Sequence, residues 1–425
     1  MLRTIIVVWV IASCGCGLDK SGLREPGGDA AIALDARPSG DGGVTPRSDG
    51  GGDDDGGLAR DGGSPPGDGG RPTDDGGVAA EVTAVAAGAA HTCALRSDGA
   101  VFCWGDDASG QLGDGSSGGF RDEPRQVTLP GPAAEIGAGA GFTCAVLGGG
   151  ELYCWGANGA GQLGDGTESD RADPVLIAGG ATRATGGGSH GCFVSVAGVA
   201  SCAGSNGEGQ LGTGGGDRSA HEAISIESGV TQMAAGDLHT CALSGGRVLC
   251  WGGNDEGQLG DGESAGRPEP EPALAITGAT AIGAGALHTC AVHAAGTSCW
   301  GAGGDGRLGN GGSSSASTPV PVTGLTDAVQ VHGGLAFTCA LRSGGGVSCW
   351  GKNDKDQLGP GTSDGSSALP VAVTELGAAS DLAVGDQHAC AVVEGAVLCW
   401  GRNNKGQLGT SGGDRADPRF VPGLE

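Results

Sequence analysis

The chain has 425 residues, of which 94 are glycine and only 14 are aromatic (7 Trp, 6 Phe and 1 Tyr), and its formal net charge is −26. Glycine at this level without a Gly-X-Y period argues against a collagen, while 38% apolar residues leave enough material for a buried core. The negative charge makes nucleic acids and anionic membrane surfaces poor partners, because both are bound through lysine and arginine.

The N-terminus has the pattern of an export signal. Arg3 supplies a positive charge, and residues 4–11 form an apolar run that is too short to span a bilayer as a stable helix. Small residues then precede Cys14, which resembles the bacterial lipoprotein signal, in which such a cysteine is lipidated after cleavage. We therefore predict a signal peptide over residues 1–13 and an exported, lipid-anchored protein of the cell envelope, most simply of the outer membrane. The alternative is an ordinary secretory signal with Cys14 and Cys16 incidental; disulfides persist in either destination.

Residues 14–80 are rich in Gly, Asp and Pro and contain almost no large apolar residue. Such a segment cannot bury enough surface to offset its conformational entropy, so we predict a disordered tether. About 60 flexible residues reach roughly 45 Å. The Asp-Gly runs lack the D-x-D-x-D-G frame with a later Glu that a calcium loop needs.

From residue 81 to residue 425 the sequence repeats itself seven times. The first cysteine of each unit recurs every 48 to 51 residues, at Cys93, Cys144, Cys192, Cys241, Cys290, Cys339 and Cys390. A period near 50 residues is typical of a propeller or a solenoid.

Each unit divides into short strands separated by Gly-rich turns. In the fourth unit we expect strands at residues 230–235, 240–243, 248–251 and 273–276, with a turn at 244–247. Four short strands in each of seven units predict an all-β fold, a seven-bladed β-propeller of four-stranded blades.

The repeat A-G-x-x-H-T-C-A-L…G-x-V-x-C-W-G-x-N-x-x-G-Q-L-G-D-G…P-V-x-V-x-G-L resembles that of the regulator of chromosome condensation (RCC1) superfamily, and most closely its cysteine-bearing bacterial branch related to the alpha-tubulin suppressor. The resemblance covers residues 81–425 and implies the same closed propeller. The third unit has Ala203 in place of Trp, and the fifth has Gly303 and Arg307 in place of Asn and Gln. We expect these two blades to be locally irregular.

Every unit carries two cysteines, 9 or 10 residues apart, with a turn such as Asp98-Gly99 or Glu394-Gly395 near the midpoint. This spacing places the two cysteines opposite each other on antiparallel strands. Zinc would require C-x2–4-C pairs or nearby histidines, so in an exported chain we predict one disulfide per repeat. The expected pairs are Cys93–Cys103, Cys144–Cys154, Cys192–Cys202, Cys241–Cys250, Cys290–Cys299, Cys339–Cys349 and Cys390–Cys399.

The other repeated residues are interpreted as structural. A tryptophan follows the second cysteine and is expected in the core between blades, at Trp104, Trp155, Trp251, Trp300, Trp350 and Trp400. The glycine after it suits a bulge or a close backbone contact. An asparagine can satisfy turn backbone groups, at Asn158, Asn206, Asn254, Asn353 and Asn403.

Histidine precedes the first cysteine by two residues in five units, at His91, His190, His239, His288 and His388. A ring of these imidazoles around a channel would offer a metal site. Because Phe142 and Phe337 occupy the same position in the other two units, we favour a packed, hydrogen-bonded role. Arg171 and Arg415, in two R-A-D-P segments, are expected to form local salt bridges, with a ligand contact at the rim as the alternative.

No nucleophile–base–acid set, phosphate-binding loop or paired carboxylate stands out from the repeats, so we expect neither an enzyme nor a cofactor. The favoured function is a monomeric module that binds an unidentified protein or surface ligand through the blade rims, without nucleic acid and with the lipid anchor as its sole membrane contact. Acidic, polar loops favour a cationic partner. The variable rim segments are residues 116–124, 167–174, 214–222, 263–272, 313–319, 362–370 and 411–418.

Two other functions are weighed. Inhibition of a secreted enzyme, by analogy with a bacterial propeller that inhibits beta-lactamase, is weakened because the variable loops offer mainly Phe120 as an aromatic anchor. Nucleotide exchange on a small GTPase, the activity of the eukaryotic namesake, is remote because units of 48 to 51 residues leave no room for an inserted wedge. We also predict that Phe420 and Val421 close the ring by sharing a blade with the strand at residues 82–85.

Overall fold

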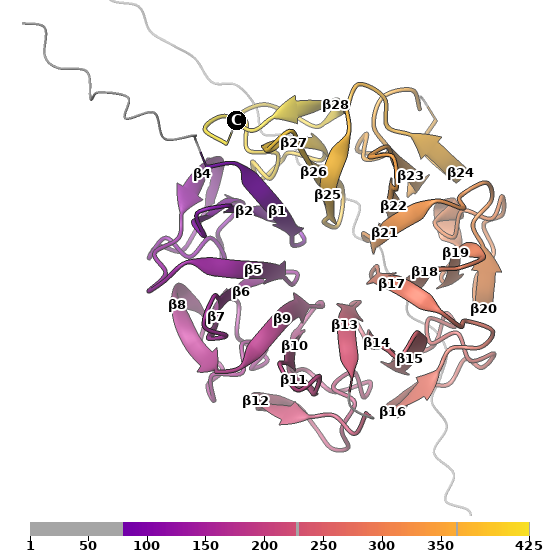
Figure 1. The fold of residues 1–425 in the computed structure, drawn as a ribbon, viewed down its shortest axis with the longest axis horizontal. Coiled ribbons are helices and arrows are strands. Elements are labelled where there is room, and N and C mark those ends of the chain that lie inside the picture. Colours follow the sequence, from indigo (N-terminus) through magenta and orange to yellow (C-terminus); the bar gives the residue numbers. More distant parts are fainter. Residues whose placement is uncertain (1–79, 227–228, 363, 425) are drawn as a thin grey trace, which may run out of the picture. The chain divides into compact units, whose positions relative to one another are not determined.

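The computed structural model describes residues 80–226, 229–362 and 364–424, which form a closed ring of seven antiparallel sheets around a central channel (Figure 1). Each sheet has four strands that are consecutive in the chain, so the predicted seven-bladed propeller is confirmed. We number the blades 1 to 7 in chain order. Residues 1–79, which hold the predicted signal peptide, Cys14 and nearly all of the predicted tether, lie outside the described residues.

The first strand of each blade lines the channel. These strands are β1 (Val82–Ala87), β5 (Ala133–Ala138), β9 (Ala181–Gly186), β13 (Val230–Ala235), β17 (Ala279–Ala284), β21 (Ala328–Gly333) and β25 (Ala379–Val384). Alanine and glycine dominate them, because small side chains allow seven strands to converge on one axis.

The second and third strands form the buried middle of each blade and are joined by tight turns. The second strands are β2 (His91–Arg96), β6 (Phe142–Leu147), β10 (His190–Ser195), β14 (His239–Ser244), β18 (His288–His293), β22 (Phe337–Arg342) and β26 (His388–Val393). The third strands are β3 (Val101–Asp106), β7 (Leu152–Gly156), β11 (Ala200–Gly204), β15 (Arg247–Gly252), β19 (Gly296–Gly301), β23 (Val347–Lys352) and β27 (Ala396–Gly401). Both faces of these strands are buried between neighbouring blades, which explains their nearly continuous apolar sequence.

The fourth strands form the exposed circumference. They are β4 (Phe120–Gln126), β8 (Arg171–Ala178), β12 (Arg218–Ala223), β16 (Arg267–Pro272), β20 (Ala316–Pro321), β24 (Ser366–Ala372) and β28 (Arg415–Phe420). The prediction of a fourth strand at residues 273–276 was wrong, because β16 precedes it and carries no large apolar residue. Ala273 and Ile276 are instead buried by the loop that follows. Charge and proline on these outer strands blunt an edge that would otherwise pair with another chain.

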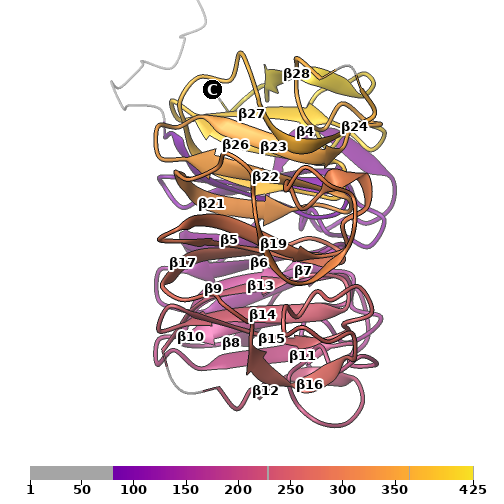
Figure 2. The same cartoon turned by 90° about the vertical axis from the view of Figure 1, so that its right-hand side faces the viewer.

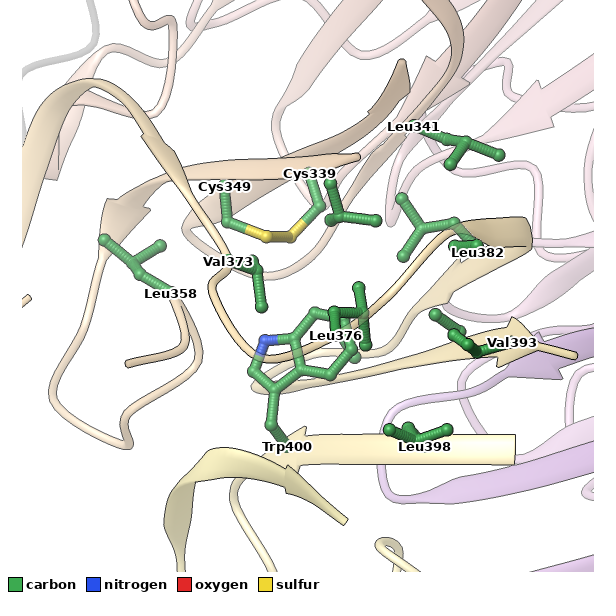
Figure 3. Packing of buried hydrophobic residues seen from close by; sticks show 14 of the residues in the cluster. Cys339, Leu341, Cys349, Leu358, Val373, Leu376, Leu382, Val393, Leu398 and Trp400 are labelled. Carbon is green, nitrogen blue, oxygen red and sulfur yellow. A yellow bond between two sulfur atoms is a disulfide. The ribbon is translucent and has the colours of Figure 1, made fainter. Parts of the chain in front are cut away.

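The core is divided among the interfaces between consecutive blades, which pack face to face (Figure 2). Figure 3 shows the interface of blades 6 and 7, where Trp400 of β27 lies against Val373 and Leu376 from the loop after β24. The disulfide of the neighbouring blade, Cys339–Cys349, belongs to the same cluster.

The ring closes by packing between blades 7 and 1 and not by a shared blade, so that prediction was also wrong. Phe420 pairs with Leu398 inside blade 7, whereas β1 pairs only with β2. Contact between the two ends is through side chains: Val421, which is fully buried, and Leu424 lie in one cluster with Val82. A shared strand is unnecessary because this interface repeats the hydrogen bonds of the others.

The only helical segment among the described residues is the 3-10 turn η1 (Gly304–Gly306) in blade 5. Asp305 within it has a φ of 59°, so the fifth blade is locally irregular, as predicted from Gly303. Among the described residues, no helix has the length and apolarity needed to cross a membrane.

Candidate binding site: the central channel and the frame around it

All seven predicted disulfides are present, each joining the second and third strands of one blade. The paired cysteines are directly opposite in register, and their Cα atoms are 4.0 to 4.1 Å apart, as expected for the close, non-hydrogen-bonded pairs of an antiparallel ladder. The cysteines are buried, with 6% exposure at most. These residues therefore hold the frame and are not available as ligands.

The repeated tryptophan joins each blade to the preceding one. Its indole N–H donates to the backbone carbonyl of the residue before Leu in G-Q-L-G, as from Trp155 to Gln111, at 2.9 to 3.0 Å in six interfaces. The glycine after tryptophan, such as Gly156, has a positive φ in every blade, and a Cβ there would lie 2.6 Å from the Gly141 carbonyl oxygen. The predicted bulge and close backbone contact are confirmed.

The asparagine and glutamine of the motif hold the loop between the third and fourth strands. Asn158 accepts from the Leu163 N–H and donates to the carbonyls of Thr167 and Ser169. Gln162 accepts from the Ala160 N–H. The same bonds recur at Asn206, Asn254, Asn353 and Asn403, which confirms their structural interpretation.

The five repeated histidines bind across interfaces and not to one another. Each Nε2 lies 2.8 to 2.9 Å from a threonine hydroxyl of the next blade: His91 with Thr143, His190 with Thr240, His239 with Thr289, His288 with Thr338 and His388 with Thr92. Each threonine donates its own proton to the carbonyl that also accepts from tryptophan. Histidine must therefore donate from Nε2, which confirms the packed, hydrogen-bonded role. No cluster of three or more His, Cys, Asp or Glu side chains suited to a metal occurs among the described residues.

The two exceptions are matched across their interfaces. Phe142 replaces histidine in blade 2, and the residue facing it in blade 3 is Gly191, where a Cβ would lie 3.2 Å from the ring. Phe337 replaces histidine in blade 6 and shares a cluster with Ala389 of blade 7. Where histidine is replaced by phenylalanine, the facing position in the next blade is therefore not threonine, because a threonine hydroxyl there would lose the Nε2–H donor.

Burial of these neutral rings predicts acid sensitivity. Nδ1 has no partner among the described residues, and burial lowers the pKa of His91 and His190 to about 4 and of His239, His288 and His388 to about 3. The unfolded chain, with histidine pKa near 6.5, binds more protons between these values, so stability must fall as pH falls below 6.5. The slope is about 1.4 kcal/mol per pH unit for each histidine charged only when unfolded. Denaturant titrations from pH 7.5 to 4.5 measure it.

Four carboxyls act in the opposite direction, because burial raises the pKa of Glu135 to about 8, that of Asp386 to about 6, and also those of Asp107 and Asp237. They are outnumbered by the histidines. The control is His239→Phe with Thr289→Ala, which copies the natural Phe337 and Ala389 pair and should reduce the proton uptake on unfolding by about one. An unchanged pH slope in this variant contradicts the assignment.

The third blade has ordinary strand pairing despite Ala203, so the expected irregularity is not found in its strands. The space that tryptophan fills elsewhere is taken by His221 of β12. A Cβ on Gly164 would lie 2.1 Å from His221 Cδ2, just as one on Gly113 would lie 2.6 Å from Trp155 Nε1. His221 also packs edge-on against Phe193, with ring centroids 4.8 Å apart.

Because His221 fills the space left by Ala203, we predict that the effects of changing positions 203 and 221 on stability are strongly coupled. The other blades carry Trp and Pro at these two positions. Ala203→Trp alone should clash with His221, and His221→Pro alone should leave a cavity, each costing about 2 kcal/mol or more. The double variant should be close to the parent protein, because the new indole fills the cavity. A thermodynamic cycle by denaturant unfolding should give a coupling of about 2 kcal/mol or more; additive effects contradict it.

The predicted rim segments lie on the exposed circumference, and their arginines have mainly local partners. Arg171 forms an ion pair with Asp165 at 2.6 Å, as expected. The salt bridge predicted for Arg415 is not found: its guanidinium donates to the Ser411 carbonyl, and Thr410 stands at the position where blades 1, 2 and 4 carry an aspartate. Exposed apolar side chains on this circumference are Phe120, Leu176, Leu369 and Phe420.

The channel is a cavity of about 280 Å³ whose wall carries polar side chains that the sequence analysis did not single out. At the third position of the inner strands, Gln232 bonds to both backbone groups of Ile282, and Glu135 accepts from the Ala184 N–H. Asp381 accepts from Val85 across the closing interface. These side chains form hydrogen bonds with backbone groups on the inner edge of the neighbouring blade's first strand, where there is no further strand to pair with. Their signal in the sequence was a polar residue interrupting an otherwise small and apolar strand.

One end of the channel, the channel mouth, is surrounded by the seven turns between first and second strands. Six of these turns place a residue in the channel lining, namely Ala89, Ala140, Gly188, Asp237, Ala286 and Asp386. In the turn of blade 6, Leu335 takes the corresponding position and donates its backbone N–H to the Asp386 carbonyl. Burial raises the pKa of both carboxyls, and Asp237 raises that of Asp386 further, although Arg402 opposes it. The turn residues at the mouth are thus small or apolar except for two carboxylates, and two arginines lie next to them: Arg402 near Asp386, and Arg307, which donates to the Leu335 carbonyl.

These features define a class: a closed β-propeller with one buried disulfide per blade and a repeated hydrogen-bond frame at its interfaces. The chain belongs to the regulator of chromosome condensation (RCC1) repeat family, whose models match residues 98–146, 149–194, 245–292, 299–341, 344–392 and 394–425, with a second model of the repeat matching residues 82–111, 134–162, 230–258 and 379–407.

Curated relatives share only part of their length with it. Probable E3 ubiquitin-protein ligase HERC3 of Homo sapiens is 40% identical over 92 residues, which cover 21% of this chain and 9% of that protein. E3 ubiquitin-protein ligase HERC2 of Homo sapiens is 36% identical over 93 residues, or 21% of this chain and 2% of that protein. The matched part is less than a tenth of either relative.

Two solved structures share the fold. Human WBSCR16 superposes with a TM-score of 0.68 at 23% identity, covering 76% of this chain and 93% of that one. Prp20p of Saccharomyces cerevisiae superposes with a TM-score of 0.66 at 18% identity, covering 75% and 85%.

Proposed function

We propose that this protein is an exported binding module for a partner protein, anchored to the outer membrane by a lipid on Cys14 and held off the surface by residues 14–80. The observation that carries the binding role is the contrast between uniform blade interfaces and variable exposed surfaces. The interfaces repeat one set of Trp, Thr and carbonyl contacts, whereas the exposed residues differ from blade to blade. A frame that is uniform and rigid, with surfaces that vary, suits recognition.

Two further observations support the proposal. Seven buried disulfides fit an oxidising compartment. Prp20p, which shares the fold, is described by its binding to Gsp1p and histones. Nucleotide exchange stays a remote alternative, and an inhibitor of a secreted enzyme would use the few exposed aromatics, Phe120 and Phe420.

Intact mass of the membrane-extracted protein, alkylated with and without reduction, tests export and anchoring. A lipid-bearing Cys14 as the first residue, with no alkylated repeat cysteine before reduction, is the expected result. An intact Met1 with fourteen alkylated repeat cysteines contradicts both export and the oxidised frame.

Photo-crosslinking in the producing cell tests the binding role. A photoreactive phenylalanine is introduced separately at three exposed positions on three surfaces: Leu238 beside the channel mouth, Phe120 on the circumference, and Val196 in the turn between β10 and β11. We expect at least one position to give a discrete adduct with another protein. Absence of adducts at all three positions contradicts the proposed function.

A further inference from the structure

Resting on the proposed function, we infer that the channel mouth is the docking surface, and that it takes a protein loop presenting one lysine or arginine between apolar residues, the basic side chain entering the channel between Asp237 and Asp386.

The first support is rigidity. A chain of backbone hydrogen bonds runs from turn to turn around the mouth, beginning with the Ala89 N–H to the Ala140 carbonyl and ending with the Leu335 N–H to the Asp386 carbonyl. The six bonds, between 3.0 and 3.2 Å, join all seven blades in sequence. A surface built in this way loses little conformational entropy when a partner binds.

The second support is the apolar surround. Leu238 is 40% exposed and Leu335 is 41% exposed, and the neighbouring turn positions are mostly alanine or glycine. The turn residues themselves carry no charge except Asp237 and Asp386, although the chain has a net charge of −26. Depletion of charge around exposed apolar side chains is typical of the centre of an interface.

The third support is charge complementarity. Asp237 follows β13 and Asp386 follows β25, and these two strands lie on opposite sides of the channel in Figure 1. Neither carboxylate has an ion-pair partner within 4.0 Å among the described residues, although the charge of Arg402 partly offsets the raised pKa of Asp386. A single cation between them relieves their mutual repulsion, whereas an anionic group adds to it. The excess negative charge of the chain also attracts a basic partner before contact.

The size of the cavity indicates which part of a partner protein could enter it. Its volume of about 280 Å³ admits a side chain, while the closed ring of turns excludes a folded element. A loop tip with one long basic residue therefore fits, and its apolar neighbours would rest on Leu238 and Leu335.

The test uses the full-length protein with the photoreactive residue at Leu238. The wild-type sequence should give an adduct whose cross-linked partner segment contains a basic residue between apolar ones. Asp237→Asn with Asp386→Asn should reduce the adduct at least tenfold. The matched control is Asp173→Asn with Asp417→Asn, which removes the same charge from exposed positions on the outer strands and should leave it unchanged.

Each other outcome contradicts the inference. An adduct that persists in the Asp237 and Asp386 variant removes the role of the carboxylates, and an adduct with a second copy of this chain identifies a different occupant. Adducts confined to the Phe120 or Val196 positions leave the proposed binding function intact but place it on another surface. Absence of all adducts contradicts the inference and the proposed function together.

Discussion

Reduction of the seven disulfides is expected to leave a chain that no longer folds. Each one closes a loop of 9 or 10 residues, which constrains the unfolded chain by about 2–3 kcal/mol in the loop-entropy account. Seven together amount to roughly 15–20 kcal/mol, more than the total stability of most domains. Few aromatic side chains are available to compensate, because the chain has only 14.

The measurement is refolding from denaturant with the thiols either oxidised or reduced and alkylated. Six tryptophans are fully buried, so the loss of their blue-shifted emission reports unfolding directly. Folded protein should resist a mild reductant, since its sulfurs are buried. A single pair, such as Cys290→Ala with Cys299→Ala, should cost about 2–3 kcal/mol and spare the fold. A cooperative unfolding transition in the fully reduced, alkylated chain contradicts the prediction.

Removal of residues 418–425 is expected to lower the melting temperature sharply, although not for the reason that a shared blade would supply. The deletion removes part of β28 together with Val421 and Leu424, which pack against Val82 across the closing interface. Loss of two buried aliphatic side chains costs about 2–5 kcal/mol each. The effect falls on the closing interface between blades 7 and 1, where opening would expose Trp104 as well.

Val421→Ala with Leu424→Ala isolates the packing from the deletion and should reproduce most of its effect by calorimetry. Arg419→Ala is the matched control, because this exposed side chain at the end of β28 pairs with Asp417 and should change stability by no more than about 0.5 kcal/mol. Equal melting temperatures for the double variant and the control contradict the assignment.

The repeat made most of the frame predictable. Cysteine spacing identified seven hairpins because an antiparallel register pairs residues symmetrically about a turn, and the structure has the same seven pairs. The roles of Trp155 and Asn158 followed from their place beside a buried cysteine and in a turn. The position of the fourth strand did not follow, because β16 is exposed and lacks the apolar alternation by which strands are recognised.

The proposed docking surface at the channel mouth was less accessible to sequence reasoning. Asp237 and Asp386 are 149 residues apart and occupy a variable position between a glycine and a histidine, so neither resembles a motif. His221 likewise stands at a position where other blades have proline, and only the structure shows that it fills the space over Gly164. Contacts across blade interfaces depend on which residue faces which, and a period alone does not specify that.

The sequence by itself determined the number of blades, the disulfide pairing and the division between repeated and variable positions. These depend on spacing within one unit and on how often the unit recurs along the chain, and both can be read without knowing which units touch. Tertiary structure alone decided how the ring closes, why histidine and threonine occur together, and which carboxylates meet at the channel mouth. Those features arise only when seven units surround one axis, which brings residues from distant blades into the same electrostatic environment.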